Sequence, residues 1–352
     1  MRVPIVPRSQ VQAPFWLGVD VGGTNLKAGV VDDRGAPLSQ VIRPTEAGRG
    51  PEVGIDNIVQ TLETAISQCG LGRDDIAGVG LATPGTMDIP AGMLLDPPNL
   101  PGWKNVPIRQ LVSDRVGLPT ILQNDANAAA YGEFWAGAAR DARSLVFWTL
   151  GTGVGCGIII GDLVVEGAHS TGAECGHIVI EMHNGRLCGT GQFGTLEAYA
   201  GAKAVVLRCQ EAIRTGRGTV LKEWIADGTE LTPLLIAEAA EAGDPMALDL
   251  ILETARFMGV GTVTVMHTID PEMVLIGGAM TFGGAGSPIG RQFLDALRAE
   301  VKRRTFPVLA EKTIIDYASL GNDAGYIGAA GCARLKLRQP NQIAVASARG
   351  SM

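Results

Sequence analysis

An asparagine–aspartate pair, Asn124-Asp125, lies where the sequence predicts that a buried strand ends and a helix begins. The apolar run 119–122 precedes the pair, and alanine-rich helix formers follow it to about Phe134. Ligands of open α/β sheets gather at the carboxyl ends of strands, and a carboxylate at a helix N-terminus stays ionised because the helix dipole favours negative charge. Asp125 is therefore a candidate general base. A helix cap is the commoner role of such a pair, so the pair alone leaves both interpretations open.

Two glycine-rich turns, each between apolar strand-like runs, could hold phosphate groups. The first is Gly22-Gly23-Thr24 and the second is Gly151-Thr152-Gly153. Glycine lets backbone N–H groups approach an anion closely, and each threonine adds a hydroxyl. Neither turn is a P-loop or a dinucleotide fingerprint, because the glycine spacing differs and a strand, not a helix, follows each turn. An ordinary tight hairpin is the alternative for each turn taken alone.

Further residues near these turns extend the candidate nucleotide site. Asp20 ends the first strand and could reach a phosphate-bound Mg²⁺ through water, and Lys27 lies on the strand after the turn. The strand 273–280 contains the pair Gly277-Gly278, where an adenine ring or a ribose could lie against the backbone. Because a similar hairpin opens each half of the chain, we expect a duplicated architecture with phosphates held between the two hairpins.

The elements that must position these groups alternate between strands and helices, which is typical of an α/β protein. Residues 15–137 are expected to form a small N-terminal α/β domain and residues 138–323 a larger C-terminal one, with helix 324–337 packing back on the first. Residues 1–14 and 339–352 are expected to be a flexible leader and tail. After the first hairpin, further strands are expected at 76–81, 119–122, 145–150, 178–181, 273–280 and 313–317. Helices are expected at 54–68, 108–116, 126–134, 196–214, 234–242, 245–268, 292–303 and 324–337.

The composition excludes several classes of protein. The 352 residues carry a formal net charge of −7, which argues against nucleic acid as a partner because phosphate binding needs a basic surface. No apolar run is long enough to span a membrane, and no secretory signal is readable at the N-terminus. Six cysteines without framework spacing indicate reduced thiols, so a cytoplasmic protein is expected.

Eight short motifs occur in an order that resembles the ROK family of repressors, open reading frames and sugar kinases, over roughly residues 15–335. The resemblance implies an α/β fold, the duplicated actin-like (ribonuclease H-like) ATPase fold, with two domains and the active site in the cleft between them. The motifs are Gly-Val-Asp-Val-Gly-Gly-Thr-Asn at 18–25, Ala-Thr-Pro-Gly at 82–85, Asn-Asp-Ala-Asn-Ala-Ala at 124–129, Leu-Gly-Thr-Gly-Val-Gly at 150–155, Glu-x-Gly-His at 174–177, Leu-Glu at 196–197, Leu-Ile-Gly-Gly at 275–278 and Asn-Asp-Ala-Gly-x-Ile-Gly-Ala-Ala at 322–330.

The resemblance also implies roles for individual residues. Asp125 resembles the base that takes a proton from the primary hydroxyl of a sugar, and this agrees with the chemistry of phosphoryl transfer, which needs mainly positioning and charge neutralisation. Thr24 and Thr152, with their glycines, resemble the two phosphate hairpins, and Gly277-Gly278 resembles the nucleoside contact. The residues that resemble sugar-hydroxyl ligands are Asn124, Glu174, His177 and Glu197, with Asn99 as a further candidate.

One departure from the family pattern concerns zinc. Many members hold a structural Zn²⁺ with the histidine of the Glu-x-Gly-His motif and three cysteines. Here only Cys188 is present, and Thr190 and Thr195 stand at the other two cysteine positions. Two protein ligands do not make a closed zinc site, so we predict no structural zinc. The alternative is a zinc site to which Cys175 or His183 contributes a further ligand.

The resemblance therefore implies an ATP- and Mg²⁺-dependent hexose kinase that phosphorylates the 6-hydroxyl of glucose. Alternatives are N-acetylglucosamine, N-acetylmannosamine, mannose, fructose or allose as acceptor and polyphosphate as donor. A sugar-sensing repressor is disfavoured, because a DNA-binding domain needs at least about 50 residues and only 21 precede Gly22. A sugar-binding protein without catalysis is disfavoured because Asp125 and both hairpins are present. The expected partners are the sugar and the nucleotide, and a homodimer or homotetramer fits the family.

Overall fold

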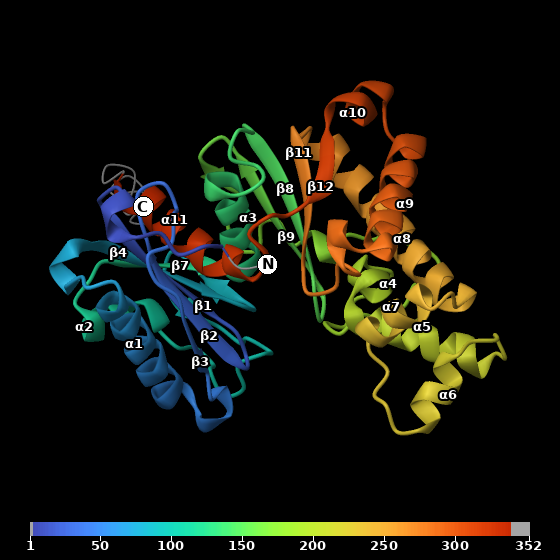
Figure 1. Cartoon of the computed structure of the whole chain (residues 1–352), viewed down its shortest axis with the longest axis horizontal. Coiled ribbons are helices and arrows are strands. Elements are labelled where there is room, and N and C mark those ends of the chain that lie inside the picture. Colours follow the sequence, from blue (N-terminus) through green and yellow to red (C-terminus); the bar gives the residue numbers. More distant parts are fainter. Residues whose placement is uncertain (1–2, 339–352) are drawn as a thin grey trace, which may run out of the picture. The chain divides into compact units, whose positions relative to one another are not determined.

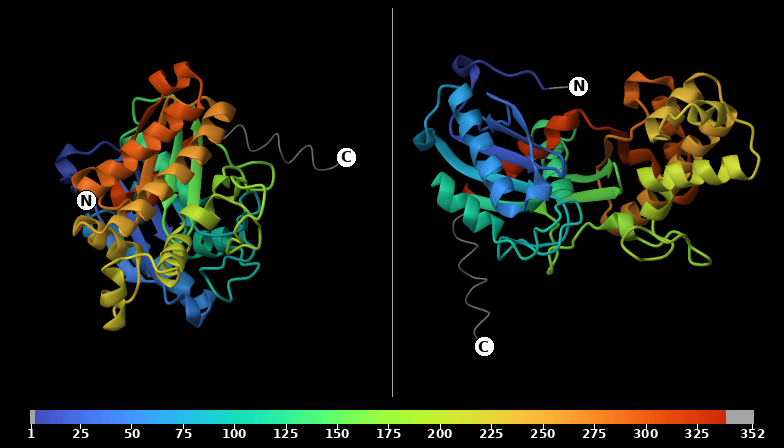
Figure 2. Two further views of the ribbon diagram at one scale, coloured as in Figure 1. Left: turned by 90° about the vertical axis from the view of Figure 1, so that its right-hand side faces the viewer. Right: turned by 90° about the horizontal axis from the view of Figure 1, so that it is seen from below.

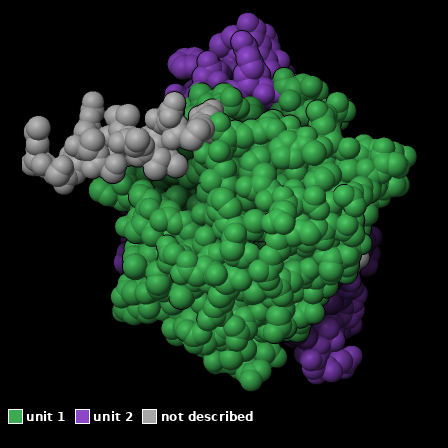
Figure 3. All heavy atoms as spheres, turned by 90° about the vertical axis from the view of Figure 1, so that its left-hand side faces the viewer, with its two compact units in different colours: residues 1–141, 159–173, 319–352 green, residues 142–158, 174–318 purple. Residues whose placement is uncertain are grey.

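The computed structural model describes residues 3–338, which form two compact units (Figure 1). Unit 1 contains the chain up to Asp141, then Ile159–Ala173, then the chain from Ser319; unit 2 contains Ala142–Ile158 and Glu174–Ala318. Figure 3 colours the two units separately. The expected leader is described from residue 3, where the Val3 N–H donates to Asp323 Oδ2 at 2.8 Å. The expected tail, 339–352, lies outside the described residues.

The first sheet has five strands in the order β3-β2-β1-β4-β7. β1 and β2 are antiparallel, as are β2 and β3, whereas β4 runs parallel to both β1 and β7. The carboxyl ends of β1, β4 and β7 therefore lie at one edge of the sheet. The bounds are Phe15–Val21 for β1, Asn25–Val31 for β2, Val41–Pro44 for β3, Ile76–Thr83 for β4 and Thr120–Asn124 for β7.

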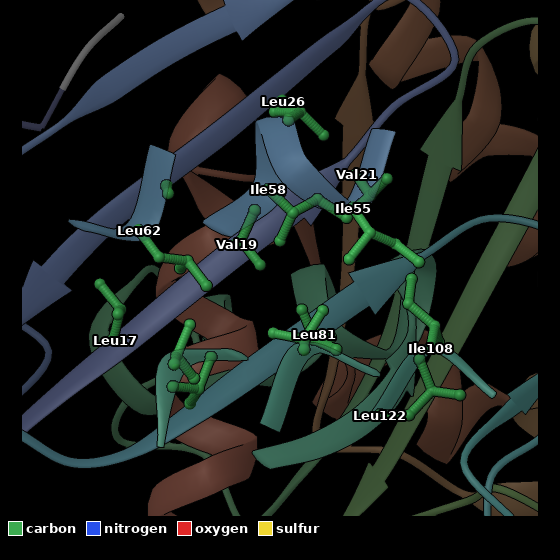
Figure 4. Packing of buried hydrophobic residues seen from close by; sticks show 14 of the residues in the cluster. Leu17, Val19, Val21, Leu26, Ile55, Ile58, Leu62, Leu81, Ile108 and Leu122 are labelled. Atoms are coloured by element: carbon green, nitrogen blue, oxygen red, sulfur yellow. The ribbon is translucent and has the colours of Figure 1, made fainter. Parts of the chain in front are cut away.

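Two helices pack their apolar faces on one side of this sheet. They are α1 (Pro51–Gln68) and α2 (Ile108–Val116). Figure 4 shows side chains from both helices pointing toward those of β1, β2, β4 and β7, in a cluster of buried residues. Full burial of one such aliphatic side chain contributes about 1.5–3 kcal/mol, so this cluster stabilises the sheet whose strand β7 leads into Asp125. The labelled residues are Leu17, Val19, Val21, Leu26, Ile55, Ile58, Leu62, Leu81, Ile108 and Leu122.

On the other side of this sheet, glycines of β1 and β4 let a helix pack closely against the strands. The helix is α11 (Ala324–Arg338), which packs on β1 and β4 and also against α3 (Asp125–Ala136). A Cβ at Gly18 would lie 1.9 Å from Tyr326 O, and one at Gly80 would lie 1.8 Å from Ala329 O. Any larger residue at either position would push α11 away. Since side chains alternate across a strand, the glycine face of β1 receives α11 while its apolar face receives α1.

A second five-stranded sheet has the order β10-β9-β8-β11-β12. Its strand bounds are Ser144–Leu150 for β8, Val154–Ile160 for β9, Leu163–Val164 for β10, Met273–Gly278 for β11 and Ile314–Tyr317 for β12. The remaining strands, β5 (Met87–Asp88) and β6 (Met93–Leu94), form a small separate ribbon.

Helices of unit 2 surround the long helix α8, which lies side by side with α9 (Figure 1 and Figure 2). The bounds are Glu197–Ala200 for α4, Ala202–Arg214 for α5, Leu221–Ala226 for α6, Pro233–Glu241 for α7, Pro245–Ile269 for α8, Pro288–Arg304 for α9 and Pro307–Lys312 for α10. No helix within residues 3–338 is long and apolar enough to cross a membrane.

Two predicted elements were wrong, and a third begins earlier than predicted. The expected strand 178–181 is a loop with one isolated bridge, Val179 to Thr195. The expected helix 196–214 breaks into α4 and α5, because Gly201 is extended and the next amide, Ala202 N–H, donates to Gly151 O at 3.0 Å. Helix α9 begins at Pro288, four residues earlier than predicted, because Ser287 caps it. Strand β3 and helices α6 and α10 were not predicted.

Candidate functional site

The pair Asn124-Asp125 lies at the junction of β7 and α3. Asn124 is the helix N-cap, because its Oδ1 accepts the N–H groups of Ala126 at 2.9 Å and Asn127 at 3.1 Å. Asp125 is the first helical residue, and its Oδ1 also accepts the Ala126 N–H, at 2.8 Å. The cap occupies Asn124 Oδ1, so a sugar contact by this residue falls to its amide nitrogen. Helix capping and a chemical role for Asp125 are therefore compatible.

Asp20 lies at the same edge of the first sheet as this junction. Strand register pairs Asp20 with Ala82 on β4, and Ala82 in turn with the residue before Asn124 on β7. Burial raises the pKa of the Asp20 carboxyl to about 6, against the opposing charge of Lys27. A Cβ at Gly325 would lie 2.3 Å from Asp20 Oδ2, so the first turn of α11 covers this carboxyl group. A nearby cation would offset the cost of keeping Asp20 ionised.

The first glycine turn lies against the segment that carries Asn99. Within the turn, the Gly22 N–H donates to Asn25 O at 3.0 Å. A Cβ at Gly23 would lie 2.6 Å from Asn99 O, so only glycine allows this approach. Gly23, Thr24 and Asn99 are all exposed. The structure thus brings a predicted phosphate hairpin and a predicted sugar ligand together within unit 1.

Lys27 is engaged by the start of α11. Its ammonium group donates to Asn322 O at 2.6 Å and to Asp323 Oδ1 at 3.3 Å. Asp323 is fully buried and also accepts a hydrogen bond from Gln40 at 2.5 Å. The charge of Lys27 therefore neutralises a buried carboxylate. This structural role is separate from the nucleotide contact predicted for Lys27.

In unit 2, the second glycine turn lies directly beside the pair Gly277-Gly278. Strand register pairs Gly278 with Leu150, the residue immediately before the turn. Gly278 has a φ of +91°, and a Cβ there would lie 2.2 Å from Leu150 O, so glycine is required. By contrast, a Cβ at Gly151 would meet nothing within 4 Å. The predicted nucleoside contact and the second phosphate hairpin are thus neighbours.

Glu197 joins the second turn to the predicted sugar ligands of unit 2. Its Oε2 accepts the Val154 N–H at 3.1 Å, directly after the turn. His177 Nε2 lies 3.9 Å from Glu174 Oε2. Burial raises the pKa of the Glu174 carboxyl, with the His177 charge opposing and the Glu197 charge adding to the rise. A Cβ at Gly176 would lie 2.0 Å from Val154 O, which explains the glycine of the Glu-x-Gly-His motif. The three predicted ligands therefore lie around Val154.

The same region contains a group that could hold a metal ion. Ligand atoms of His177, Cys188 and Glu197 all lie within 4.8 Å of one another. His177 Nδ1 is buried and has no hydrogen-bond partner within the described residues. Cys188 Sγ instead contacts Thr190 Oγ1 at 2.9 Å, and although burial raises the pKa of this thiol, hydrogen bonds led by that of Thr190 lower it to about 7.

This group does not complete the zinc site of the family, because a closed structural site needs four ligands and threonine is a poor one. Cys175 and His183, the alternative ligands, do not belong to the group. Cys175 shares a hydrogen bond with Cys156, and the His183 N–H donates to Glu181 at 2.8 Å. The absence of structural zinc stays a prediction, and metal analysis must test it because three protein ligands suffice for some zinc sites.

Two buried polar residues on β7 and α3 were not predicted from the sequence. One is Gln123, whose contacts are described below. The other is Glu133 on α3, which is 0% exposed and accepts hydrogen bonds from the N–H groups of Ala138, Ser319 and Leu320. A carboxylate in an otherwise alanine-rich helix was the available signal. Glu133 ties α3 to the chain that leads into α11.

The model of the ROK family matches residues 16–335 of the chain. The chain belongs to the ROK family. Among its relatives in this family, the glucokinase of Streptomyces coelicolor is 36% identical over 325 residues, covering 90% of this chain and 97% of that protein. The xylose repressor of Caldicellulosiruptor bescii is 28% identical over 327 residues, covering 93% of this chain and 80% of that protein.

Solved structures of ROK proteins share the fold. A ROK hexokinase from Thermus thermophilus has a TM-score of 0.78 at 31% identity, covering 92% of this chain and 99% of that one. A ROK glucokinase from Streptomyces griseus, in complex with glucose and AMPPNP, has a TM-score of 0.74 at 34% identity, covering 91% and 99%. The predicted α/β fold class, the duplicated actin-like ATPase fold of two domains, is confirmed.

Proposed function

We propose that this ROK protein is an ATP-dependent kinase that transfers a phosphoryl group to the 6-hydroxyl of glucose. The coarser assignment, a sugar kinase, is supported by the glucokinase of S. coelicolor and by the S. griseus glucokinase with glucose and AMPPNP. The observation that carries the proposal is the position of Asp125, which begins α3 at the strand edge that also holds Asp20.

Asp125 is proposed as the general base. The hydroxyl oxygen of the sugar attacks the γ-phosphorus, its proton passes to the Asp125 carboxylate, and the bond between the γ-phosphorus and the bridging oxygen of ADP breaks. The N-terminus of α3 favours the ionised carboxylate that this step needs. The sugar hydroxyls are assigned to Asn99, Asn124, Glu174, His177 and Glu197.

The nucleotide is assigned to the two glycine turns and the glycine pair on β11. Thr24 and Thr152 offer hydroxyls to phosphate oxygens, and Gly277-Gly278 offers backbone to the nucleoside. Asp20 is the residue of unit 1 assigned to Mg²⁺, because its buried carboxyl group has a raised pKa that a cation would lower. Bound Mg²⁺ neutralises charge on the β- and γ-phosphate oxygens.

The test measures ADP release in a coupled assay across a panel of hexoses and N-acetylhexosamines, with ATP and polyphosphate as donors. The expected result is the highest kcat/KM for glucose with ATP. A higher value for another sugar, or for polyphosphate, would replace the substrate while keeping the kinase. No turnover with any sugar would overturn the proposal.

A sugar sensor without catalysis is the second candidate, favoured by the likeness to a xylose repressor. Glucose binding in calorimetry without phosphoryl transfer would support the sensor. We further propose that the kinase acts in the cytoplasm as a homodimer or homotetramer. Sedimentation velocity would measure the oligomeric state, and a monomer at assay concentration would contradict it.

A further inference from the structure

Gln123 is a fully buried residue with two side-chain hydrogen bonds that run in opposite directions. Its Oε1 accepts the N–H of the next residue, Asn124, at 2.8 Å. Its Nε2 donates to Glu166 Oε1 at 2.7 Å. The ammonium group of Lys336, on α11, donates to the same oxygen of Glu166. Three segments of unit 1 that are distant in sequence therefore meet behind the Asn124-Asp125 pair.

The carboxylate of Glu166 determines which way the Gln123 amide points. An ionised carboxylate only accepts hydrogen bonds, so it pairs with the NH₂ end of the amide and leaves Oε1 for Asn124. The reversed amide would point an NH₂ group at the Asn124 N–H and an oxygen at a carboxylate. Lys336 donates to the same oxygen of Glu166, so a second donor faces this carboxylate and, among the described residues, no acceptor competes for it there.

Asn124 gains from this partner because β7 is the edge strand of its sheet, with β4 beside it. Among the described residues, no strand lies on the outer side of β7 to hold the backbone where α3 begins. A side-chain oxygen supplies a hydrogen bond at that point. The Asn124 backbone, held extended at φ −68° and ψ 144°, sets the direction in which α3 and its first residue, Asp125, leave the sheet.

We propose that Gln123, oriented by Glu166 and Lys336, is a positioning residue that fixes the Asn124-Asp125 junction for phosphoryl transfer. The proposal rests on the proposed function, in which Asp125 is the base. Misplacement of a reacting group by about 1 Å costs up to about 100-fold in rate, so a change at Gln123 should act on kcat without any contact to the substrate.

The test exchanges the amide and the carboxylate between positions 123 and 166, so that donor and acceptor change places. Gln123→Leu removes both hydrogen bonds, and Gln123→Glu places two carboxylates against each other. Either change should lower kcat by roughly 10–100-fold and leave KM for ATP unchanged. Adding Glu166→Gln to Gln123→Glu restores one donor facing one acceptor, so the double variant should regain most of the lost kcat. Gln110→Leu is the matched control, because Gln110 also donates to a carboxylate, that of Asp114, but on an exposed helix face.

A purely structural role would lower the melting temperature of the Gln123 variants without lowering kcat per folded molecule, and this would overturn the proposal. So would a double variant no more active than Gln123→Glu alone. Hydrogen exchange of a peptide spanning residues 122–127 provides a readout that needs no activity, and Gln123→Leu should speed exchange there. If the wild type shows no kinase activity, the proposed function fails, and unchanged exchange in Gln123→Leu would separately overturn the positioning role.

Discussion

Each of the two sheets begins with a glycine-rich hairpin, but the side chains that precede the two turns differ. Asp20 lies two residues before Gly22, the first glycine of the first turn. Thr149 lies two residues before Gly151, the first glycine of the second turn. In both sheets the first two strands are joined by the turn and a parallel strand lies on the other side of the first. One hairpin thus offers a buried carboxyl group and the other a hydroxyl, so the first can add a negative charge to a cation site and the second cannot.

Strands further along each sheet also end in residues of different chemistry. In the first sheet β7 ends at Asn124, directly before Asp125 at the start of α3, whereas in the second sheet β11, which takes the position of β4, ends in Gly277-Gly278. The first edge offers side chains that can take a proton or bind hydroxyls. The second offers bare backbone. A repeated scaffold therefore presents different groups at its strand ends, which is the edge where ligands of open α/β sheets bind.

Asp125→Asn should have the largest effect, because it removes the base from the first edge while keeping the size of the side chain. We expect kcat to fall by about 10²–10⁴-fold with the glucose affinity retained. Single-turnover kinetics and calorimetry measure the two quantities. Asp141→Asn, at a side chain that is 94% exposed, is the control. Activity close to wild type in Asp125→Asn would remove Asp125 from the role of base.

Gly278→Ala tests the second edge, where backbone conformation matters and side-chain chemistry does not. An alanine at φ +91° costs about 1–3 kcal/mol of stability, and its Cβ would press on Leu150 O, so KM for ATP should also rise. Gly151→Ala is the matched control for stability, because its Cβ would enter open space. Denaturant unfolding and ATP titrations measure both effects. Equal stability of the two variants would contradict the structure at this edge.

Asp20→Asn tests the carboxylate that distinguishes the first hairpin. Because burial raises the Asp20 pKa to about 6 from 3.8, the folded protein binds this proton more tightly than the unfolded chain, and ionisation at higher pH costs stability. The variant should therefore be more stable than wild type above pH 6, by roughly 1–3 kcal/mol, and the difference should vanish below about pH 4. Mg²⁺-dependent ATP affinity should fall.

Unfolding curves on both sides of these pKa values measure the difference, with Asp295→Asn, at an exposed ion pair, as control. A stability difference that grows as the pH falls would show that the sign of the Asp20 pKa shift is wrong.

Metal removal should have the smallest effect. If no structural zinc is present, plasma emission finds no zinc in the dialysed protein, and a chelator leaves the melting temperature and the sugar affinity unchanged. Zinc at one per chain, lost together with His177→Ala, would show instead that His177, Cys188 and Glu197 form a metal site in unit 2. Such a site would also remove Glu197 from the sugar ligands.

Elements whose signals are local were predictable from the sequence. The first hairpin, helix α2 and the capped start of α3 follow from glycine turns, apolar periodicity and the Asn124 cap. The break at Gly201 was not predictable, because it depends on a hydrogen bond to Gly151, far away in sequence. Likewise, the family pattern linked His177 with Cys188 through the zinc site, but it assigned Glu197 to the sugar and gave no sign that its carboxylate lies within 4.8 Å of both.

The sequence by itself determined the residue types and the local turns, since a glycine at a tight turn or an asparagine at a helix start acts on its own neighbours. Only the tertiary structure decided which distant groups share a charge or a hydrogen bond. Lys27 pairs with Asp323 because glycine-rich packing brings α11 against the first sheet, and Gln123 pairs with Glu166 because the loop after β10 reaches β7. Burial in that packing, absent from any local pattern, raises the pKa of Asp20.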